Sequence, residues 1–392
     1  MSDSNKKLLI VAPYFYPNIE WGGPVTVSLN HAVALKNAGY TVTVLTTNAS
    51  NRENKLENIP SDINGVRIIY AKGILPKTAW SLRIFLSFDQ IIKGWKLIPE
   101  FDMVHFHDCF IIQNIVLSIR CRLLRIPYVI TPHGSLSFAK ERSKSVLKRV
   151  FTNLLMGKYL EGSSKIITVS ESEKKDIDLN FPKLKNKTIC VPNIIKAESF
   201  AKIDIRSRLH IPEGDLILLC LSRLYQLKGV AELTLGFLKF LEKYNKNATL
   251  IFAGPDAGAV NEIKRLLSET RFRNKVIFTG EVVGEIKSNI IYNVDIVCLL
   301  SKSESMPTVL LEAASFAKPV ICTKECNMDS LINYGGAILT TRKAEDIATS
   351  INKLTKNETR LSIGKKAKDW FDKNYNTTKI VNKYKDIYKN AK

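Results

Sequence analysis

Two glutamates flank a predicted loop between a buried strand and a helix. Glu304 lies in the loop and Glu312 in the apolar segment that follows, with seven residues between them. Pro307 suits the first helical position, because its missing N–H would have no intrahelical partner there and its φ is already helical. Thr308 and Val309 then present free N–H groups at the positive end of a helix, where proteins bind anions. The sequence predicts an anion site between two carboxylates.

A carboxylate beside an anion site needs a ligand that satisfies both. A sugar nucleotide does so, because its diphosphate accepts hydrogen bonds from N–H groups while its hydroxyls donate to carboxylates. The alternative is an ordinary strand, loop and helix with two solvated glutamates, since this spacing is common. The flanking S-x-S-E and E-A-A-x-x-A-K-P-V-I favour the ligand site.

Two cations lie in the segment LSRLYQLKGV, between a predicted strand and a helix that follows Gly229. Arg223 offers a planar guanidinium that can donate paired bonds to a diphosphate, and Lys228 offers a compact ammonium. Either cation alone is unremarkable. Spaced this way after a strand, they are the strongest phosphate-binding candidates in the chain.

In the first half of the chain, candidate ligand-binding residues again follow strands. Gly22 and Gly23 precede a helix predicted to begin near Pro24, so backbone N–H groups there can approach an anion closely. His133 directly follows a predicted strand, at the edge of the sheet where α/β folds bind ligands. We therefore expect both segments to contribute to a ligand site.

Two further groups of residues raise the question of a metal. In FDMVHFHDCF, we expect only one of His105 and His107 to face a given side of the strand. Lining of the ligand site by His107 or Asp108 is therefore favoured over metal binding. Cys322 and Cys326 form the only close cysteine pair, and no nearby histidine or second pair completes a metal site.

This combination of motifs resembles the retaining glycosyltransferases of family 4, which have a GT-B fold. Glu304 and Glu312 match the E-x7-E signature, and His133 matches a histidine that lies beside the donor sugar in that family. SRLYQLKG resembles G-R-x-x-x-x-K-G with Ser222 in place of the first glycine, and VPNII has Ile194 where a glycine usually follows the asparagine. The resemblance covers nearly the whole chain and describes the donor class better than the individual sugar.

The resemblance implies a role for each matched residue. His133 and Glu304 would be catalytic, with Glu304 holding the sugar hydroxyls, and Glu312 would bind the ribose. The remaining expected donor-binding residues are Gly22, Gly23, Arg223, Lys228, Glu281, Val282, Met306, Pro307, Thr308 and Val309. The donor would be a UDP- or GDP-sugar. No metal or cofactor is expected, because the two cations take the role that Mg²⁺ plays elsewhere.

Strands rich in Val, Ile and Leu alternate with helical stretches, which is typical of parallel α/β sheets. The predicted strands are 8–12, 41–46, 66–70, 103–106, 128–131, 166–169, 188–191, 216–221, 249–253, 276–279, 295–300 and 319–322. One open sheet does not comfortably take so many strands. The sequence therefore predicts two Rossmann-like, doubly wound α/β domains facing a cleft.

The chain of 392 residues is long enough for two such domains. The alternating pattern pauses near 192–204, which predicts an N-terminal, acceptor-binding domain over 1–197 and a C-terminal domain for the nucleotide sugar over 198–374. By resemblance to GT-B enzymes, the C-terminal helix, 375–392, is expected to return to the first domain.

The chain is strongly basic, with 58 Lys and Arg against 37 Asp and Glu, a net charge of +21. The charge is spread over both halves and no nucleic-acid-binding motif is present, so an anionic membrane surface is the favoured partner and nucleic acid is not. Residues 139–156, AKERSKSVLKRVFTNLLM, predict a basic amphipathic helix. It either lies on a membrane or packs on its own domain with a solvated basic face.

The sequence also bears on location. No apolar run reaches the roughly 18 to 20 residues that a bilayer helix needs. The start, MSDSNKK, leads into a strand without a signal-peptide core, and the seven cysteines lie mostly in apolar runs, as reduced and buried thiols do. We expect a cytoplasmic protein, with peripheral association at the inner face of the plasma membrane.

The expected reaction is transfer of a hexose from a nucleotide diphosphate sugar to a hydroxyl, with retention at the anomeric carbon. The acceptor would be a glycan or a polyprenyl-diphosphate-linked sugar in O-antigen, capsule or exopolysaccharide biosynthesis. A nucleotide-sugar epimerase of similar fold is the alternative, and it would release free sugar without an acceptor. A non-catalytic binding protein is disfavoured by the intact set of charged positions.

Overall fold

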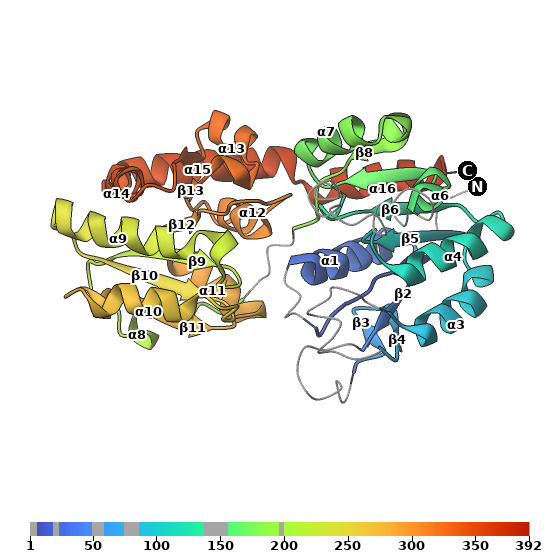
Figure 1. The fold of residues 1–392 in the computed structure, drawn as a ribbon, viewed down its shortest axis with the longest axis horizontal. Coiled ribbons are helices and arrows are strands. Elements are labelled where there is room, and N and C mark those ends of the chain that lie inside the picture. The colour runs from blue at the N-terminus through green and yellow to red at the C-terminus, as the bar shows by residue number, and fades with distance from the viewer. Residues whose placement is uncertain are drawn as a thin grey trace, which may run out of the picture. The chain divides into compact units, whose positions relative to one another are not determined.

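The computed structural model describes residues 6–18, 23–48, 59–73, 86–136, 156–195 and 200–391. The chain divides into two compact units (Figure 1), of which unit 1 comprises Met1–Ile194 with Thr377–Lys392 and unit 2 comprises Ile195–Asn376. Each unit is built on its own largely parallel sheet. The predicted fold class of two doubly wound α/β domains is thus confirmed.

The sheet of unit 1 has the strand order β3-β4-β2-β1-β5-β6-β7-β8. Its strands are β1 Lys7–Val11, β2 Thr41–Thr47, β3 Asp62–Ile63, β4 Val66–Ala71, β5 Met103–His107, β6 Tyr128–Thr131, β7 Lys165–Thr168 and β8 Thr188–Cys190. Among the described strands of this sheet, only β3 pairs in the antiparallel direction. β1 pairs with β2 on one side and β5 on the other, so the direction of winding reverses between β1 and β5.

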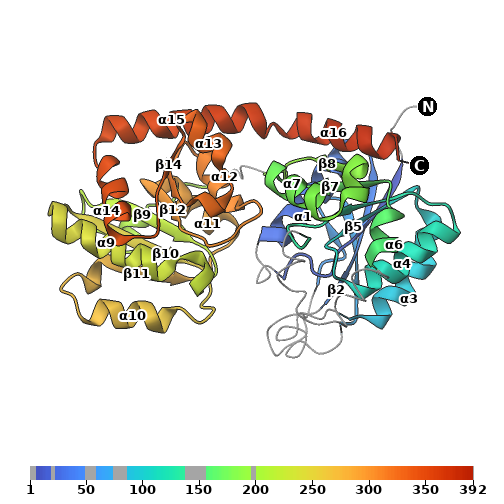
Figure 2. The same ribbon diagram turned by 45° about the horizontal axis from the view of Figure 1, so that its top comes forward.

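Helices cover both faces of this sheet, so its central strands are buried runs of apolar residues. The helices of unit 1 are α1 Gly23–Asn37, α3 Phe88–Leu97, α4 Ile112–Leu123, α6 Gly157–Glu161, α7 Glu171–Asn180 and α16 Thr377–Lys389. α3 packs against α4, and α4 against α6. α16 is the C-terminal helix, drawn in red in Figure 2. It packs against α1.

The sheet of unit 2 has the order β11-β10-β9-β12-β13-β14, the arrangement of a dinucleotide-binding Rossmann sheet. Its strands are β9 Leu216–Leu221, β10 Ala248–Ala253, β11 Val276–Gly280, β12 Ile296–Leu299, β13 Val320–Cys322 and β14 Ala337–Leu339. β9 pairs with β10 and β12, so the switch point lies between β9 and β12. Open α/β sheets bind ligands at the carboxyl ends of strands beside such a point.

Helices also flank the second sheet. They are α8 Ile205–Arg208, α9 Val230–Tyr244, α10 Val260–Ser268, α11 Gly284–Asn293, α12 Thr308–Ser315, α13 Asp329–Tyr334, α14 Ala344–Lys353 and α15 Asn357–Asn374. α9 packs against α14 and α10, whereas α12 packs against α15 and α11. No described helix is long and apolar enough to cross a bilayer.

The twelve predicted strands are all present, with ends that differ by one residue at most. Two strands were missed. β3 has two residues and β14 has three, and such short strands leave no apolar run that distinguishes them from a loop. The predicted basic helix over 139–156 lies outside the described residues except for Met156.

Candidate functional site

The loops that follow β9 and β12 meet at the switch point of unit 2. Arg223 and Lys228 follow β9, and Glu304 follows β12. The backbone N–H of Lys302 donates to the carbonyl of Leu227 at 2.8 Å, which ties the two loops together. Three of the predicted site residues therefore lie where a Rossmann sheet binds its ligand.

Lys228 and Glu304 form an ion pair through Nζ and Oε1. The side chains are only 16% and 14% exposed, so the two charges are largely shielded from solvent. The hydroxyl of Ser301 also donates to Oε1 of Glu304, at 2.7 Å. Within the described part of the chain, Oε2 makes no hydrogen bond and remains an acceptor for a ligand hydroxyl.

Arg223 lies beside this pair without a carboxylate of its own. Its Cζ is 5.5 Å from the ring centroid of Tyr225, and the Nζ of Lys228 is 6.0 Å from the same centroid. Arg223 is partly buried and forms no ion pair with any described residue. Because a shielded cation without a counter-ion is costly, this position is suited to an anionic ligand.

Gly229 allows the loop after β9 to approach β12 closely. It begins α9 with φ +67°, and a Cβ there would lie 2.2 Å from the carbonyl oxygen of Leu300. Only glycine fits both the left-handed backbone and that contact. The K-G element is therefore held directly against the end of β12.

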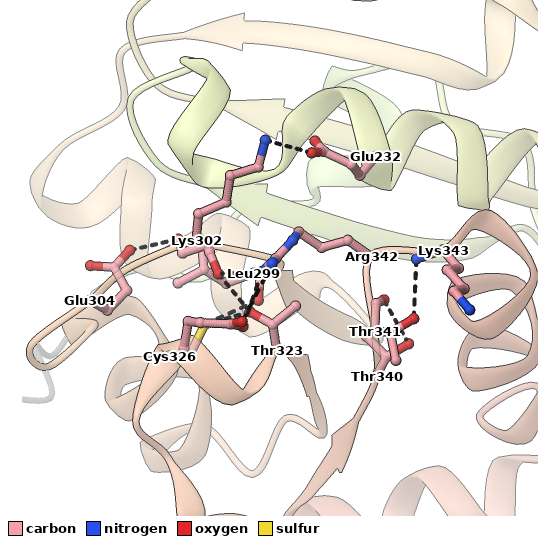
Figure 3. Close-up of polar contacts among 12 residues, drawn as sticks. Glu232, Leu299, Lys302, Glu304, Thr323, Cys326, Thr340, Thr341, Arg342 and Lys343 are labelled. Atoms are coloured by element: carbon pink, nitrogen blue, oxygen red, sulfur yellow. Dashed lines mark hydrogen bonds and ion pairs between the residues drawn. The ribbon is translucent and has the colours of Figure 1, made fainter. Parts of the chain in front are cut away.

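A set of buried polar contacts supports the loop that carries Glu304 (Figure 3). Thr323 donates through Oγ1 to the carbonyl of Ser301 at 2.7 Å, and the thiol of Cys326 donates to the carbonyl of Leu299 at 3.3 Å. The backbone N–H of Glu304 donates to the carbonyl of Glu325 at 3.0 Å. Cys326 is thus a buried structural thiol, and burial raises its pKa to about 11.

Arg342 also contacts this loop. Its guanidinium forms two bonds with the Glu325 carboxylate, at 3.0 and 3.3 Å, and lies 3.5 Å from the carbonyl of Ser301. Lys302 points away from Glu304 and pairs with Glu232 at 2.8 Å, as Figure 3 shows. Lys302 is therefore a structural cation of the loop.

The start of α12 differs in one respect from the prediction. Pro307 occupies the N-cap, with φ −75° and ψ +102°, and the first helical residue is Thr308. The prediction of Pro307 at the first helical position was wrong by one residue, because its fixed φ also suits the extended N-cap conformation. Thr308 and Val309 are the first two helical residues and carry the expected free N–H groups.

Glu312 lies one turn further along α12 and is already paired. Its Oε1 accepts from Nζ of Lys287, on α11, at 2.7 Å. The side chains are 12% and 21% exposed. Nothing in the sequence singled out Lys287, because it is one of many lysines and its partner is 25 residues away.

The other predicted donor-binding residues of unit 2 lie in neighbouring loops. Met306 precedes the N-cap of α12 and is partly exposed. Glu281 and Val282 directly follow β11 and are also partly exposed. The N–H of Gly254 donates to the carbonyl of Gly280 at 2.7 Å, so this loop lies next to the end of β10. These residues share the same edge of the sheet as Arg223.

In unit 1, the predicted glycine pair is only half described. Gly22 lies outside the described residues, and Gly23 is the first residue of α1. Asp108 directly follows β5, at the reversal in winding, and accepts from the hydroxyl of Tyr14 at 3.3 Å. His133 follows β6 with φ +52°, a left-handed conformation that few non-glycine residues adopt and that histidine tolerates better than most.

The expectation that only one of His105 and His107 faces a given side of β5 was wrong. Their ring centroids lie 4.6 Å apart, and both side chains are buried. Residues i and i+2 of a strand point to the same face of the sheet. The expectation had treated them as pointing to opposite faces. His31 of α1 joins them, and one ring nitrogen from each of the three lies within 4.8 Å of the others.

These histidines are uncharged at neutral pH. Burial, followed by the charge of His133, lowers the pKa of His31 to about 3, and burial lowers the pKa of His133 to about 4. Burial also holds the pKa values of His105 and His107 well below the usual range. His133 is the one partly exposed member of the group, and its Nε2 lies 2.8 Å from Nδ1 of His107.

Glu173 is a further residue that the motifs did not identify. Its carboxylate accepts from the N–H groups of Gly134 and Val169, at 2.5 and 2.8 Å, and so holds the turn that carries His133. Burial raises the pKa of Glu173 to about 7 despite these two donors. The available signal was the S-x-x-E pattern of Ser170 and Glu173, which predicts a capping box at the start of α7.

Comparisons with known proteins agree with this architecture. Residues 201–370 match the family model "Glycosyl transferases group 1", and residues 21–199 match "Glycosyltransferase Family 4". An uncharacterized glycosyltransferase of Methanocaldococcus jannaschii is 23% identical over 348 residues, 84% of this chain and 86% of the relative. TuaC of Bacillus subtilis, provisionally assigned as a teichuronic acid biosynthesis glycosyltransferase, is 24% identical over 321 residues, 79% of this chain and 76% of the relative.

The same fold is present in a solved structure of Anabaena Alr3699/HepE in complex with UDP and glucose. It covers 97% of this chain and 98% of its own, with a TM-score of 0.75 and 17% identity. Both family models describe glycosyl transferases, so the epimerase alternative is not favoured. This chain belongs to the family 4 glycosyltransferases and has their GT-B fold.

Proposed function

We propose that this glycosyltransferase moves a hexose from a nucleotide diphosphate sugar to a hydroxyl of a glycan or lipid-linked acceptor, with retention and without a metal. The observation that supports this most directly is the grouping at the switch point of unit 2. There Lys228 pairs with Glu304 while Arg223, partly buried, has no carboxylate among the described residues.

The charge that develops during transfer explains the two cations. As the bond between sugar and phosphate breaks, negative charge grows on the diphosphate and positive charge on the sugar ring. Arg223, Lys228 and the N–H groups at the start of α12 stabilise the diphosphate. A pair of fixed cations supplies the stabilisation that a divalent metal would otherwise give.

The two glutamates then act on hydroxyl groups. Oε1 of Glu304 is occupied by Lys228 and Ser301, so Oε2 accepts from the sugar hydroxyls and orients the ring. Glu312, held by Lys287, accepts from the ribose, and Glu281 with Val282 contacts the base. In unit 1, His133 is the proposed catalytic contact to the sugar. The HepE complex with UDP supports a uridine donor as the first candidate.

A lipid-linked acceptor is supported by the surface of α3 and α4 in unit 1. Phe88 and Ile92 on α3 are 58% and 56% exposed, and Ile119 and Leu123 on α4 are 46% and 67% exposed. Arg120 links the two helices, because its Cζ lies 5.2 Å from the ring centroid of Trp95. Exposed apolar side chains beside arginines suit the interface of an anionic membrane.

The net charge of +21 strengthens the attraction to such a surface, because anionic lipids concentrate in the cytoplasmic leaflet. We therefore propose that the enzyme works at the inner face of the plasma membrane on a polyprenyl-diphosphate-linked sugar. The product would enter a surface polysaccharide, such as an O-antigen, a capsule or an exopolysaccharide. The relation to TuaC supports this context.

A donor panel tests the proposal. Thermal unfolding is followed with UDP-glucose, UDP-galactose, UDP-N-acetylglucosamine, GDP-mannose and GDP-fucose, since a bound donor stabilises the folded protein by mass action. The donor that stabilises the protein is then incubated with and without a membrane lipid extract. Transfer requires both, and its product retains the anomeric configuration. Release of free sugar at full rate without the extract would contradict transfer.

A further inference from the structure

The buried histidines of unit 1 form a hydrogen-bonded network that joins the helices α1 and α16 to the strands β5 and β6. Tyr388, on α16, lies with its hydroxyl 2.8 Å from Nδ1 of His105 and 3.2 Å from Nε2 of His31. Nε2 of His105 lies 2.7 Å from Oγ1 of Thr131. Nδ1 of His107 lies 2.8 Å from Nε2 of His133 and 3.1 Å from Oγ of Ser28.

Two ring nitrogens in this network have no partner. They are Nδ1 of His31 and Nε2 of His107, and both are buried. Each neutral imidazole carries one proton, on one nitrogen or the other. The position of each proton therefore decides whether an unpartnered atom is a bare acceptor or an N–H without an acceptor.

The nitrogen that carries the proton can be assigned for His107 and for His133. Buried N–H groups without an acceptor are rarer in proteins than acceptors without a donor. A proton on Nε2 of His107 would be such an N–H, whereas a proton on Nδ1 finds Nε2 of His133 at 2.8 Å. With its Nε2 accepting this bond, neutral His133 carries its own proton on Nδ1.

We infer that His107 is a positioning residue that fixes His133 in the Nδ1–H form, so that His133 presents a hydrogen-bond donor to its ligand. Within the described residues, Nδ1 of His133 has no partner and the side chain is partly exposed. The inference rests on the proposed contact of His133 with the sugar. It makes His133 a donor to a sugar oxygen and excludes its use as a general base through Nδ1.

The remaining members of the network are consistent with the same rule. Nε2–H of His31 donates to the Tyr388 oxygen, the Tyr388 hydroxyl donates to Nδ1 of His105, and Nε2–H of His105 donates to Thr131. Each of these ring N–H groups then has an acceptor. In this assignment, the two buried nitrogens without a partner, Nδ1 of His31 and Nε2 of His107, carry no proton.

A metal ion held by His31, His105 and His107 is the competing use of these nitrogens. Their candidate ligand atoms lie within 4.8 Å of one another, whereas two imidazole nitrogens on a tetrahedral zinc are about 3.4 Å apart. Both nitrogens of His105 are also engaged, with Tyr388 and Thr131. The rings would have to move together and His105 would have to lose a hydrogen bond.

Two-bond ¹H–¹⁵N correlation spectra of ¹⁵N-histidine-labelled protein test the assignment, because they distinguish Nδ1–H from Nε2–H rings. The chain has five histidines, and the fifth, His210, is exposed and serves as a solvent-accessible reference. We expect Nδ1–H patterns for His107 and His133 and Nε2–H patterns for His31 and His105. An Nε2–H pattern for His133 would overturn the inference.

Substitutions separate positioning from packing. His107→Asn keeps an amide N–H near the place of Nδ1 and should keep His133 in the Nδ1–H form, whereas His107→Leu should let the Nε2–H form appear. If His107→Leu does not fold, Ser28→Ala serves instead. It leaves His133 as the sole acceptor of the His107 proton, so the wild-type pattern should persist. A change of the His133 pattern in Ser28→Ala would contradict the assignment.

Two further outcomes are decisive. A shift of the His31, His105 and His107 signals on addition of one equivalent of zinc chloride would overturn the assignment in favour of a metal. The catalytic role of His133 is tested separately with His133→Ala in the transfer assay. An unchanged transfer rate there, with the Nδ1–H pattern present in the wild type, would remove the proposed role of His133 and leave the tautomer assignment standing.

Discussion

At the scale of single residues, the paired charges of unit 2 carry the proposed chemistry. Lys228 and Glu304 come from loops 76 residues apart and meet in an ion pair that is largely shielded from solvent. Removing one partner of such a pair leaves the other charge without compensation. Lys228 therefore holds Glu304, and on the proposed function it also binds the diphosphate.

Lys228→Ala should lower kcat/KM for donor roughly ten- to a hundredfold or more, because a charge-assisted bond contributes about 1.5 to 3 kcal/mol. Lys302→Ala is the matched control, since Lys302 lies on the same loop as Glu304 but pairs with Glu232. Steady-state kinetics of both variants check the prediction. Equal losses in the two would show that only the loop structure matters.

Glu173 gives a prediction for pH. Burial raises its pKa to about 7 in the folded chain, from 4.5 for an ordinary glutamate. The folded state then binds more protons than the unfolded state between these values, so this residue's contribution to stability is full below pH 4.5 and is lost as pH rises through 7. The difference is on the order of 3 kcal/mol.

Glu173→Gln replaces the titrating carboxyl group with an amide. The free energy of unfolding of this variant should therefore change less between pH 5 and pH 8 than that of the wild type. Denaturant unfolding at the two pH values measures the difference. Parallel pH profiles for wild type and variant would contradict the raised pKa.

Residues that belong to a motif lie in the loops where the sequence placed them. Arg223, Lys228 and Glu304 stand together at one switch point as a set of loop ends should. Lys287 was missed, because a lysine on a helix has no pattern until its partner is placed. Ser301 belongs to the S-x-S-E that flanks the loop, but its hydrogen bond to Glu304 was not predicted. His107 was misjudged through the side-chain periodicity of a strand.

At the scale of elements, the contact between Gly229 and the end of β12 fixes the geometry of the site. Gly229 is left-handed, and its α-carbon hydrogen faces the carbonyl of Leu300. The helix α9 therefore begins as close to β12 as the backbone permits. Any side chain at this position would push Lys228 away from Glu304.

Gly229→Ala should cost roughly 1 to 3 kcal/mol from backbone strain, with a further cost from the clash with Leu300. Gly214→Ala is the control, because Gly214 is also left-handed, at φ +84°, but has open space around its α-carbon. Thermal unfolding should show a larger loss for Gly229→Ala. Equal losses of stability in the two variants would mean that the clash with Leu300 adds no cost to the substitution at Gly229.

Element boundaries were predictable because buried parallel strands read as continuous apolar runs. β9, Leu216–Leu221, was predicted with both ends correct. β14 was not, because its three residues include the half-exposed Leu339 at the end of the sheet. Pro307 was placed one residue too far into its helix, since sequence alone does not separate the N-cap from the first turn.

At the scale of the whole molecule, the chain returns to unit 1 at its end. α16 belongs to that unit and places Tyr388 against His31 and His105, which are 357 and 283 residues away in the sequence. No local pattern predicts so distant a contact. The expectation of a returning helix came from the family resemblance alone.

Tyr388→Phe should destabilise unit 1 by about 1 to 3 kcal/mol, because it leaves buried ring nitrogens of His31 and His105 without their partner. Tyr334→Phe is the control. Tyr334 is 37% exposed, and its hydroxyl accepts from Lys373 at the surface. Denaturant unfolding monitored by fluorescence compares the two. A loss in the control as large as that in Tyr388→Phe would contradict the buried network.

The central claim is that Arg223 and Lys228 bind the diphosphate of a nucleotide sugar. Calorimetric titration with UDP tests it most directly, with GDP as the second nucleotide, on wild type, Arg223→Ala, Lys228→Ala and Lys302→Ala. The account predicts saturable binding of one nucleotide to the wild type and to Lys302→Ala, and at least tenfold weaker binding to the other two variants. Equal affinity of all four proteins for the nucleotide would contradict it.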